Sequence, residues 1–555
     1  MTIGFGRVIW PVRKLFAILL LAASAVSADD LTYRSIQSGP SPTGTPIYDH
    51  GIRGEGQIIA FLDTGVDYDS CYFAEPDGSR PPINTLLDTN NVDLSRRKII
   101  AYDFLYSCDA FPGAPGCDDP NDPTAYDNTR HGTTTAAAAV ADRGSASRDS
   151  ADGLAPHARM IVQDGGFIGP DSCSDRPGFG CPVNLTPILE QAYRQGARIH
   201  SNSWGDRQGV PPPSNPPTGN YSAGARDIDA FVWSHPDMLV VFNTGNANAS
   251  PPPSSLSAPG DAKNTIQVGG TRDPMHYDDD YLSWFSLIGP TRDGRIKPDL
   301  IAPAFATLAD SDGNVLTNNC NATRQFGTSY ASPVVAGAAA LVRQYYMEGF
   351  YPTGVATVAD RLTPSAALLK ATLIAAARRA PYVAPSTGLV DTKPVPSYEQ
   401  GFGFPVLGDV LYFSGDRAKL RVLDVPLLSG LAEGENRVLR FNVHSGTPLK
   451  VVLVWTDPPG VPRGVSDSTP ELVNDLDLRV YDPAGALLFG NEVLHPGQPD
   501  RLNNVEVVSV PQPLAGTYLV SISANLLGLG PRQSYALVVT GDIDDGSARS
   551  RAVRH

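Results

Sequence analysis

Hydrophobic residues in the first two thirds of the chain form short continuous runs that alternate with helical patterns. The strand-like runs occupy residues 58–62, 158–162, 238–242 and 265–268. Helical patterns cover residues 133–142 and 187–195. Strands that are apolar throughout and alternate with helices are typical of a parallel sheet with helices on both faces. The pattern therefore predicts an α/β domain over residues 29–408.

The hydrophobic pattern changes after about residue 408. Short runs rich in β-forming residues are then separated by turn residues, with no long helical pattern between them. These runs are 438–443, 450–455, 476–480, 517–522 and 535–539. Such spacing predicts an all-β, jelly-roll-like sandwich over residues 409–543. Residues 544–555 are polar and charged, and are expected to form a disordered tail.

The first 28 residues have the pattern of a secretory signal peptide. Arg13 and Lys14 precede an apolar run at 15–23, and residues 26–28 offer small side chains for cleavage after Ala28. A membrane anchor is the alternative, but the apolar run is shorter than a bilayer-spanning helix. We therefore expect export, and no membrane contact after cleavage.

Charge and cysteine content narrow the class of protein further. The 555 residues carry 43 basic and 58 acidic side chains, for a formal net charge of −15. Nucleic acid is excluded as an expected partner, because phosphate binding requires a basic surface. Six cysteines fit an oxidising compartment, whereas the absence of a CxxC motif argues against a metal site. Short loops suggest the pairs Cys108–Cys117 and Cys173–Cys181, which leaves Cys71–Cys320; other pairings stay open.

Three motifs carry candidate chemistry. Asp63-Thr64-Gly65 follows an apolar strand, His131-Gly132-Thr133 opens an alanine-rich helix, and Ser329 lies in a GTSYASP segment that opens another helix. Each alone has a simple structural explanation, as a turn aspartate, a helix-start histidine or an N-cap serine. Together they supply a nucleophile, a base and the acid that orients the base, which predicts an Asp-His-Ser catalytic triad.

The order Asp, His, Ser and the sequences around these residues resemble those of the subtilisin-like serine proteases, or subtilases. The resemblance implies a three-layer α/β fold with a mostly parallel sheet. It also implies a secreted serine endopeptidase that cleaves protein or peptide substrates through an acyl-enzyme at neutral to alkaline pH. No charge is evident at the base of a primary pocket, so apolar or broad specificity is expected. The protein is expected to act as a monomer.

Two further segments match the family. Asn246 follows a strand and Gly245, so the resemblance gives it the oxyanion role, with Asn243 as the alternative. The segment Ser203-Trp204-Gly205 resembles the substrate-binding strand, along which an extended peptide would pair. Trp204 is either a pocket wall or a core residue.

The second domain carries a closer resemblance. Residues 453–458, 472–478 and 503–506 match the KP-43-type alkaline subtilases, which have a C-terminal β-sandwich and bind calcium. Asp475 and Asp477 share one strand face, either as a solvated surface or as a calcium site. Asp457 and Asp500 are further candidate ligands.

The sequence also departs from the family pattern. Thr134 replaces a usual histidine, Ala137 a usual glycine, and Tyr330 the methionine that usually follows the serine. Residues 29–62 are too few for the folded pro-domain of many relatives, so the chain either folds unaided or needs a helper that this sequence does not include.

Two other functions compete with an active subtilase. One is an inactive member that binds extracellular partners through its sandwich. The other is an acid peptidase of the same fold with a Ser-Glu-Asp site. The intact triad argues against the first. His131 argues against the second, because a histidine base suits neutral to alkaline pH.

Overall fold

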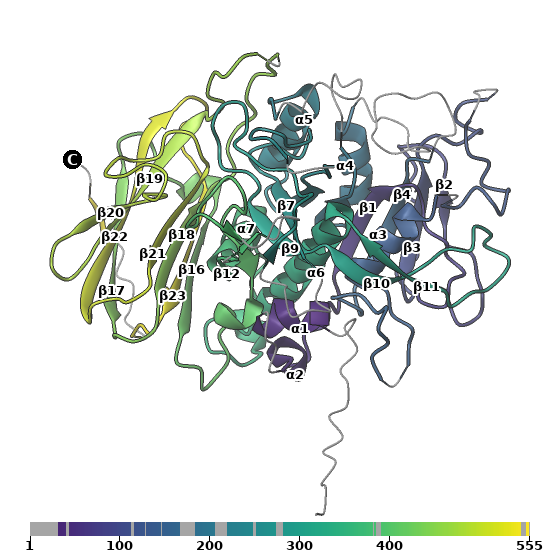
Figure 1. The fold of residues 1–555 in the computed structure, drawn as a ribbon, viewed down its shortest axis with the longest axis horizontal. Coiled ribbons are helices and arrows are strands. Elements are labelled where there is room, and N and C mark those ends of the chain that lie inside the picture. The colour runs from purple at the N-terminus through teal and green to yellow at the C-terminus, as the bar shows by residue number, and fades with distance from the viewer. Residues whose placement is uncertain are drawn as a thin grey trace, which may run out of the picture.

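The computed structural model places most of the chain (Figure 1). The described residues are 31–39, 44–112, 116–127, 129–145, 147–166, 184–205, 219–247, 251–272, 281–380, 382–383, 390–464, 466–544 and 551–553. The expected signal peptide at 1–28 and the pair Cys173–Cys181 lie outside these residues. Within them, every helix is too short or too polar to cross a bilayer.

One large sheet forms the centre of the first domain. Its strands within the described residues are β1 (Ile58–Asp63), β2 (Ile83–Asn84), β3 (Ile99–Phe104), β4 (Arg159–Asp164), β5 (Ile199–Asn202), β6 (Leu239–Asn243), β7 (Ile266–Thr271), β8 (Tyr281–Leu282), β9 (Leu300–Pro303), β13 (Tyr382–Val383) and β14 (Val390–Asp391). They run in the order β14-β13-β8-β7-β6-β5-β1-β4-β3-β2, with β9 beside β7. Pairing is parallel from β2 to β7. The mostly parallel sheet confirms the predicted α/β fold.

Helices pack around this sheet. They are α1 (Leu31–Ser38), α2 (Pro46–Asp49), α3 (His131–Val140), α4 (Thr186–Arg194), α5 (Ala223–Ser234), α6 (Thr328–Met347) and α7 (Ala366–Ala375), with short 3-10 turns at Val358–Asp360, Leu407–Asp409 and Leu427–Ser429. The long helix α6 packs along β5, β6, β7 and β9, and contacts α3 and α7. Small residues allow this approach: a Cβ on Gly337 of α6 would lie 3.5 Å from the backbone of Ala139 in α3. The two helices that begin with catalytic motifs are therefore neighbours.

Two small antiparallel ribbons complete the first domain. They are β10 (Phe305–Ala309) with β11 (Ala322–Phe326), and β12 (Ala377–Arg378) with β15 (Phe404–Pro405). Disulfides join Cys108 to Cys117 and Cys71 to Cys320, as the cysteine spacing suggested. The second of these bonds ties the loop after β1 to the loop between β10 and β11.

The second domain is the predicted antiparallel sandwich. One sheet has the order β16-β23-β18-β21 and the other β20-β19-β22-β17-β24. The strands are β16 (Lys419–Val425), β17 (Asn436–Val443), β18 (Leu449–Val454), β19 (Asn474–Tyr481), β20 (Leu487–Phe489), β21 (Val505–Val510), β22 (Gly516–Leu527), β23 (Tyr535–Gly541) and β24 (Arg551–Val553). Inward residues such as Trp455, Leu476 and Tyr518 fill the space between the sheets. The strand β24, which lies within the tail expected at 544–555, pairs with β17.

The two domains share an extensive interface. The sandwich lies beside the α/β domain (Figure 1), and its strands β18 and β23 pack on α7. Val452 and Val538, on these strands, belong to the hydrophobic core of the first domain. Lys263 of the first domain and Asp457 of the second form a fully buried ion pair. Residues of the sandwich therefore contribute to the hydrophobic core of the first domain.

Candidate active site

The three motif residues come from the ends of three elements. Asp63 is the last residue of β1, His131 the first of α3, and Ser329 the second of α6. His131 Nδ1 lies 2.6 Å from Asp63 Oδ1, and both side chains are buried. The His131 ring is centred 6.3 Å from that of Tyr330, the residue after Ser329. The fold thus gathers the predicted acid, base and nucleophile at one place.

Several hydrogen bonds hold the Asp63 carboxylate in position. Its Oδ1 accepts the Thr64 backbone N–H at 2.8 Å, and its Oδ2 accepts the Thr135 hydroxyl at 3.3 Å. A neutral imidazole that donates its Nδ1–H to this carboxylate carries its lone pair on Nε2. The arrangement therefore orients His131 to accept a proton through Nε2.

Asp127 is a positioning residue that the sequence motifs did not reveal. Its buried carboxylate accepts the Thr64 hydroxyl at 2.7 Å and the Thr133 backbone N–H at 2.7 Å. It thus joins the residue after Asp63 to the first turn of α3, where unpaired backbone N–H groups need acceptors. Burial raises the pKa of Asp127 to about 7, against the opposing effect of these hydrogen bonds. The sequence offered one signal for this role, which is an aspartate four residues before a histidine that begins a helix.

Ser329 lies at the N-terminus of a long buried helix. Its Oγ donates to the carbonyl oxygen of Ser203 at 3.3 Å, and Ser203 Oγ donates to the carbonyl oxygen of Ser329 at 2.7 Å. Pro333 lies inside α6 and has no N–H to donate to the Ser329 carbonyl oxygen, so the hydroxyl of Ser203 takes the place of that helix hydrogen bond. The helix N-terminus supplies a partial positive charge that favours an anion forming near Ser329.

Asn246 is held beside this helix end. Its Oδ1 accepts the backbone N–H of Thr328 at 2.9 Å and the Thr328 hydroxyl at 3.1 Å. This leaves the Nδ2 amino group as the donor end of the amide. The alternative, Asn243, is buried and turns its own Nδ2 toward the Thr328 hydroxyl at 3.4 Å. Of the two, Asn246 has the amino group available for an oxyanion.

Comparison with known proteins agrees with this geometry. Residues 54–403 match the family model of the subtilases, the S8 peptidases. The chain belongs to the subtilase family. It is 28% identical to the serine protease/ABC transporter B family protein tagA of Dictyostelium discoideum, over 92% of this chain and 32% of tagA. It is 26% identical to a thermophilic serine proteinase of Bacillus sp. (strain AK1), over 58% of this chain and 60% of that proteinase.

The chain spans about a third of the length of the tag proteins that it matches. Among solved structures, the serine protease of Aeromonas sobria aligns with 88% of this chain and 89% of its own, at 15% identity and a TM-score of 0.37. A cold-adapted subtilisin-like serine proteinase aligns with 68% of this chain and 96% of its own, at 17% identity and a TM-score of 0.39.

The expected substrate segment of this subtilase follows β5. Trp204 is only 3% exposed and packs edge-on against Phe242, with ring centroids 5.3 Å apart, so it is a core residue. A Cβ on Gly205 would lie 2.6 Å from Ser257 Oγ, and a Cβ on Gly245 would lie 3.3 Å from the same atom. Ser257 therefore lies between these two glycines.

The expected calcium ligands of this subtilase carry arginine partners. Arg501 Nη1 lies 2.8 Å from Asp475 Oδ2 and also contacts Asp477 Oδ1. Arg479 lies 2.8 Å from Asp477 Oδ2. Because two guanidinium groups already balance these carboxylates, Asp475 and Asp477 fit an arginine-bridged pair and do not fit a calcium site.

The two further candidate calcium ligands, Asp457 and Asp500, also have partners. Asp457 pairs with Lys263, and Asp500 Oδ2 accepts hydrogen bonds from Asn491 and Asn503 at 2.7 Å each. Within the described residues, no three His, Cys, Asp or Glu side chains converge as a metal site. Bound calcium stays a prediction.

Proposed function

We propose that this protein is a secreted serine endopeptidase that hydrolyses peptide bonds through Asp63, His131 and Ser329. The observation that carries the proposal is the 2.6 Å contact between His131 Nδ1 and Asp63 Oδ1, at the N-terminus of a helix that packs against the helix of Ser329. Secretion rests on the signal-like segment 1–28. Membership of the KP-43-type subfamily rests on the three matching stretches of the sandwich.

In the proposed mechanism, Ser329 Oγ attacks the carbonyl carbon of the scissile bond while His131 Nε2 takes its proton. Asp63 stabilises the imidazolium that forms. The oxyanion accepts hydrogen bonds from Asn246 Nδ2 and from the Ser329 backbone N–H. His131 then gives its proton to the leaving amine, and a water molecule hydrolyses the acyl-enzyme by the same sequence of proton transfers. Because His131 must be neutral to act as a base, activity is expected at neutral to alkaline pH.

We infer an apolar or broad preference at the primary pocket. The groups beside Gly205 and Gly245 are Ser257, Ala258 and Leu287, none of which is charged. A substrate in extended conformation would pair with the backbone of residues 203–205 as an added strand.

The test is casein hydrolysis by the purified mature protein at pH 8–9, with a fluorophosphonate probe and with Ser329→Ala as the matched variant. The proposal expects probe labelling and hydrolysis in the parent, and neither in the variant. Folded parent protein with no labelling and no hydrolysis would favour a binding protein that uses its sandwich. A pH–rate profile with its maximum near pH 4 would favour an acid peptidase.

A further inference from the structure

Two buried aspartates lie close together on the loop that follows β1. Asp67 is fully buried and Asp69 is only 9% exposed. Their carboxyl groups are near enough to share a hydrogen bond when one of them is protonated. Two carboxylates in contact repel each other unless a proton or a cation lies between them. This pair is separate from the catalytic carboxylate Asp63, four residues earlier.

In each of these carboxylates, one oxygen accepts hydrogen bonds and the other has no hydrogen-bond partner among the described residues. Asp67 Oδ2 accepts the Asn319 side-chain amide at 3.0 Å and the Asp312 backbone N–H at 3.2 Å. Asp69 Oδ2 accepts the Asn318 backbone N–H at 2.9 Å. The Oδ1 atoms of Asp67 and Asp69 and the hydroxyl of Ser70 are buried and have no hydrogen-bond partner within the described residues. Buried polar atoms without partners are rare in native proteins and point to a missing ion or water.

The surrounding charges do not balance the pair. Asp310 and Asp312, on the loop between β10 and β11, add negative charge nearby. Among the described residues, Arg130 lies 3.7 Å from Asp310, and Arg80 and Arg96 are within electrostatic reach of Tyr68, but none of the three forms an ion pair with Asp67 or Asp69. Elsewhere the same protein supplies lysines for buried carboxylates, as Lys297 and Lys370 do for Asp299.

We propose that Asp67, Asp69 and Ser70 bind a divalent, oxygen-preferring cation, calcium, between the loop after β1 and the loop between β10 and β11. Oxygen ligands are those that calcium requires, and water molecules complete its shell of six to eight. Two carboxylates supply less charge than a high-affinity site, so the affinity is expected in the range of about 10⁻⁴–10⁻³ M, as in extracellular modules.

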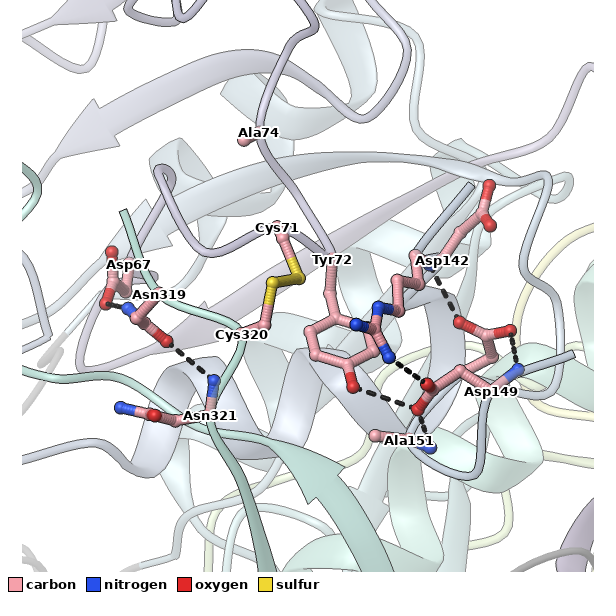
Figure 2. Close-up of a disulfide and its surroundings, with 12 residues drawn as sticks. Asp67, Cys71, Tyr72, Ala74, Asp142, Asp149, Ala151, Asn319, Cys320 and Asn321 are labelled. Atoms are coloured by element: carbon pink, nitrogen blue, oxygen red, sulfur yellow. Dashed lines mark hydrogen bonds and ion pairs between the residues drawn. A yellow bond between two sulfur atoms is a disulfide. The ribbon is translucent and has the colours of Figure 1, made fainter. Parts of the chain in front are cut away.

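The position of the site indicates a structural role for the cation, which would hold two loops together near α3. Figure 2 shows Asp67 and Asn319 beside the Cys71–Cys320 disulfide, which fastens the same two loops. The Asp67 backbone N–H donates to the Thr133 hydroxyl at 2.9 Å, two residues after His131 on α3. The cation would therefore fix the loop that leads from Asp63 against the helix of His131.

The experiment uses the full-length Ser329→Ala protein, in which self-cleavage cannot obscure the result. The protein is stripped with EDTA, and thermal unfolding is followed while calcium chloride is added to about 10 mM. We expect the Tm to rise by about 3 °C. Terbium luminescence excited through tyrosine, with Tyr68 next to both aspartates in the sequence, gives an independent measure of binding.

Asp69→Asn is the decisive variant, and the exposed Asp88→Asn is its matched control. We expect Asp69→Asn to lose the calcium response and the terbium signal, yet to unfold in EDTA at the parental temperature or above, because it removes a like-charge contact. Asp88→Asn and Asp475→Asn should keep the full response. An unresponsive parent, a responsive Asp69→Asn, or loss of the response in Asp475→Asn would overturn the proposal. A Tm that falls with rising pH and ignores calcium would assign the pair a shared proton instead.

Discussion

The backbone of Gly132 lies directly against the carbonyl oxygen of Gly65. A Cβ atom on Gly132 would be 1.9 Å from that oxygen, far inside any van der Waals contact. The helix motif that begins with His131 is thus in backbone contact with the strand motif that begins with Asp63. The closeness of the two backbones is what allows Asp63 and His131 to reach hydrogen-bond distance.

Gly132→Ala is therefore expected to separate the two motifs. Because the contact is with backbone, relief requires α3 to shift by a large fraction of an ångström, and a misplacement of about 1 Å can cost about 100-fold in rate. We expect kcat/KM to fall by about that factor while the protein stays folded. Gly44→Ala, where no atom lies within 4 Å of the added Cβ, is the control. Parental activity in Gly132→Ala would contradict the role of this contact.

Asp127→Ala is expected to weaken the contact between the residue after Asp63 and the first turn of α3. The substitution leaves the Thr133 N–H and the Thr64 hydroxyl without their acceptor. Loss of a helix-capping carboxylate typically costs about 1–2 kcal/mol of folding free energy. Because Asp127 positions the triad, we also expect kcat to fall with little change in KM. Steady-state kinetics and denaturant unfolding of the same preparation measure both effects, and a loss of stability with unchanged kcat would limit Asp127 to a capping role.

The positions of the three candidate triad residues in the fold could be predicted from the sequence because each lies in a short motif with a local structural meaning. Asp63 ends an apolar strand, and His131 and Ser329 begin helices, so a parallel fold brings them to one region. The alternation of apolar runs likewise predicted both domains, since continuous apolar strands signal burial on both faces.

The role of Asp127 and the partner of Asp475 and Asp477 depend on contacts between residues far apart in the sequence, which no local sequence pattern reveals. Asp127 acts through Thr64 and Thr133, and only the fold brings them together. The alternation of Asp475 and Asp477 correctly predicts one strand face, but Arg501, 24 residues or more away, decides what that face binds. Sequence periodicity reports which side a residue faces and does not report its partner.

The buried pair Lys263 and Asp457 should couple the two domains. Lys263 Nζ also donates to the carbonyl oxygens of Pro458 and Glu471, at 2.6 and 2.8 Å. Asp457→Ala would leave a buried ammonium group without its counter-charge, which typically costs about 3–5 kcal/mol. We expect calorimetry to show a lower Tm. The double variant Lys263→Met/Asp457→Leu should recover most of the loss, and an equally unstable double variant would show that packing, not charge, dominates there.

Tyr330 should make the enzyme resistant to peroxide. Its ring is 5% exposed and lies beside His131, where the family usually has an oxidisable methionine. We expect the parent to keep its activity in hydrogen peroxide and Tyr330→Met to lose it progressively. Residual activity against time measures this. Equally rapid inactivation of both proteins would place the sensitive group elsewhere.

Asp261 should make stability depend on pH in the opposite sense to an ordinary ion-paired aspartate. It is fully buried, neither carboxyl oxygen accepts a hydrogen bond from a described residue, and burial raises its pKa to about 7 despite the nearby charge of Arg295. A raised folded-state pKa means that the native state favours the protonated form. This contribution is complete below the usual aspartate pKa and is lost as pH rises through about 7.

Asp261→Asn removes that titration, so its stability relative to the parent should increase between about pH 5 and pH 9, by at most about 3 kcal/mol. Asp299 provides the contrast, because Lys297 and Lys370 outweigh its burial and lower its pKa. Asp299→Asn should therefore lose stability relative to the parent as pH rises toward the carboxyl's ordinary pKa, and the deficit should stay constant at higher pH. Denaturant unfolding at several pH values measures both differences. Parallel pH profiles for Asp261→Asn and the parent would mean that Asp261 stays ionised in the folded protein and that a cation or ordered water compensates its charge.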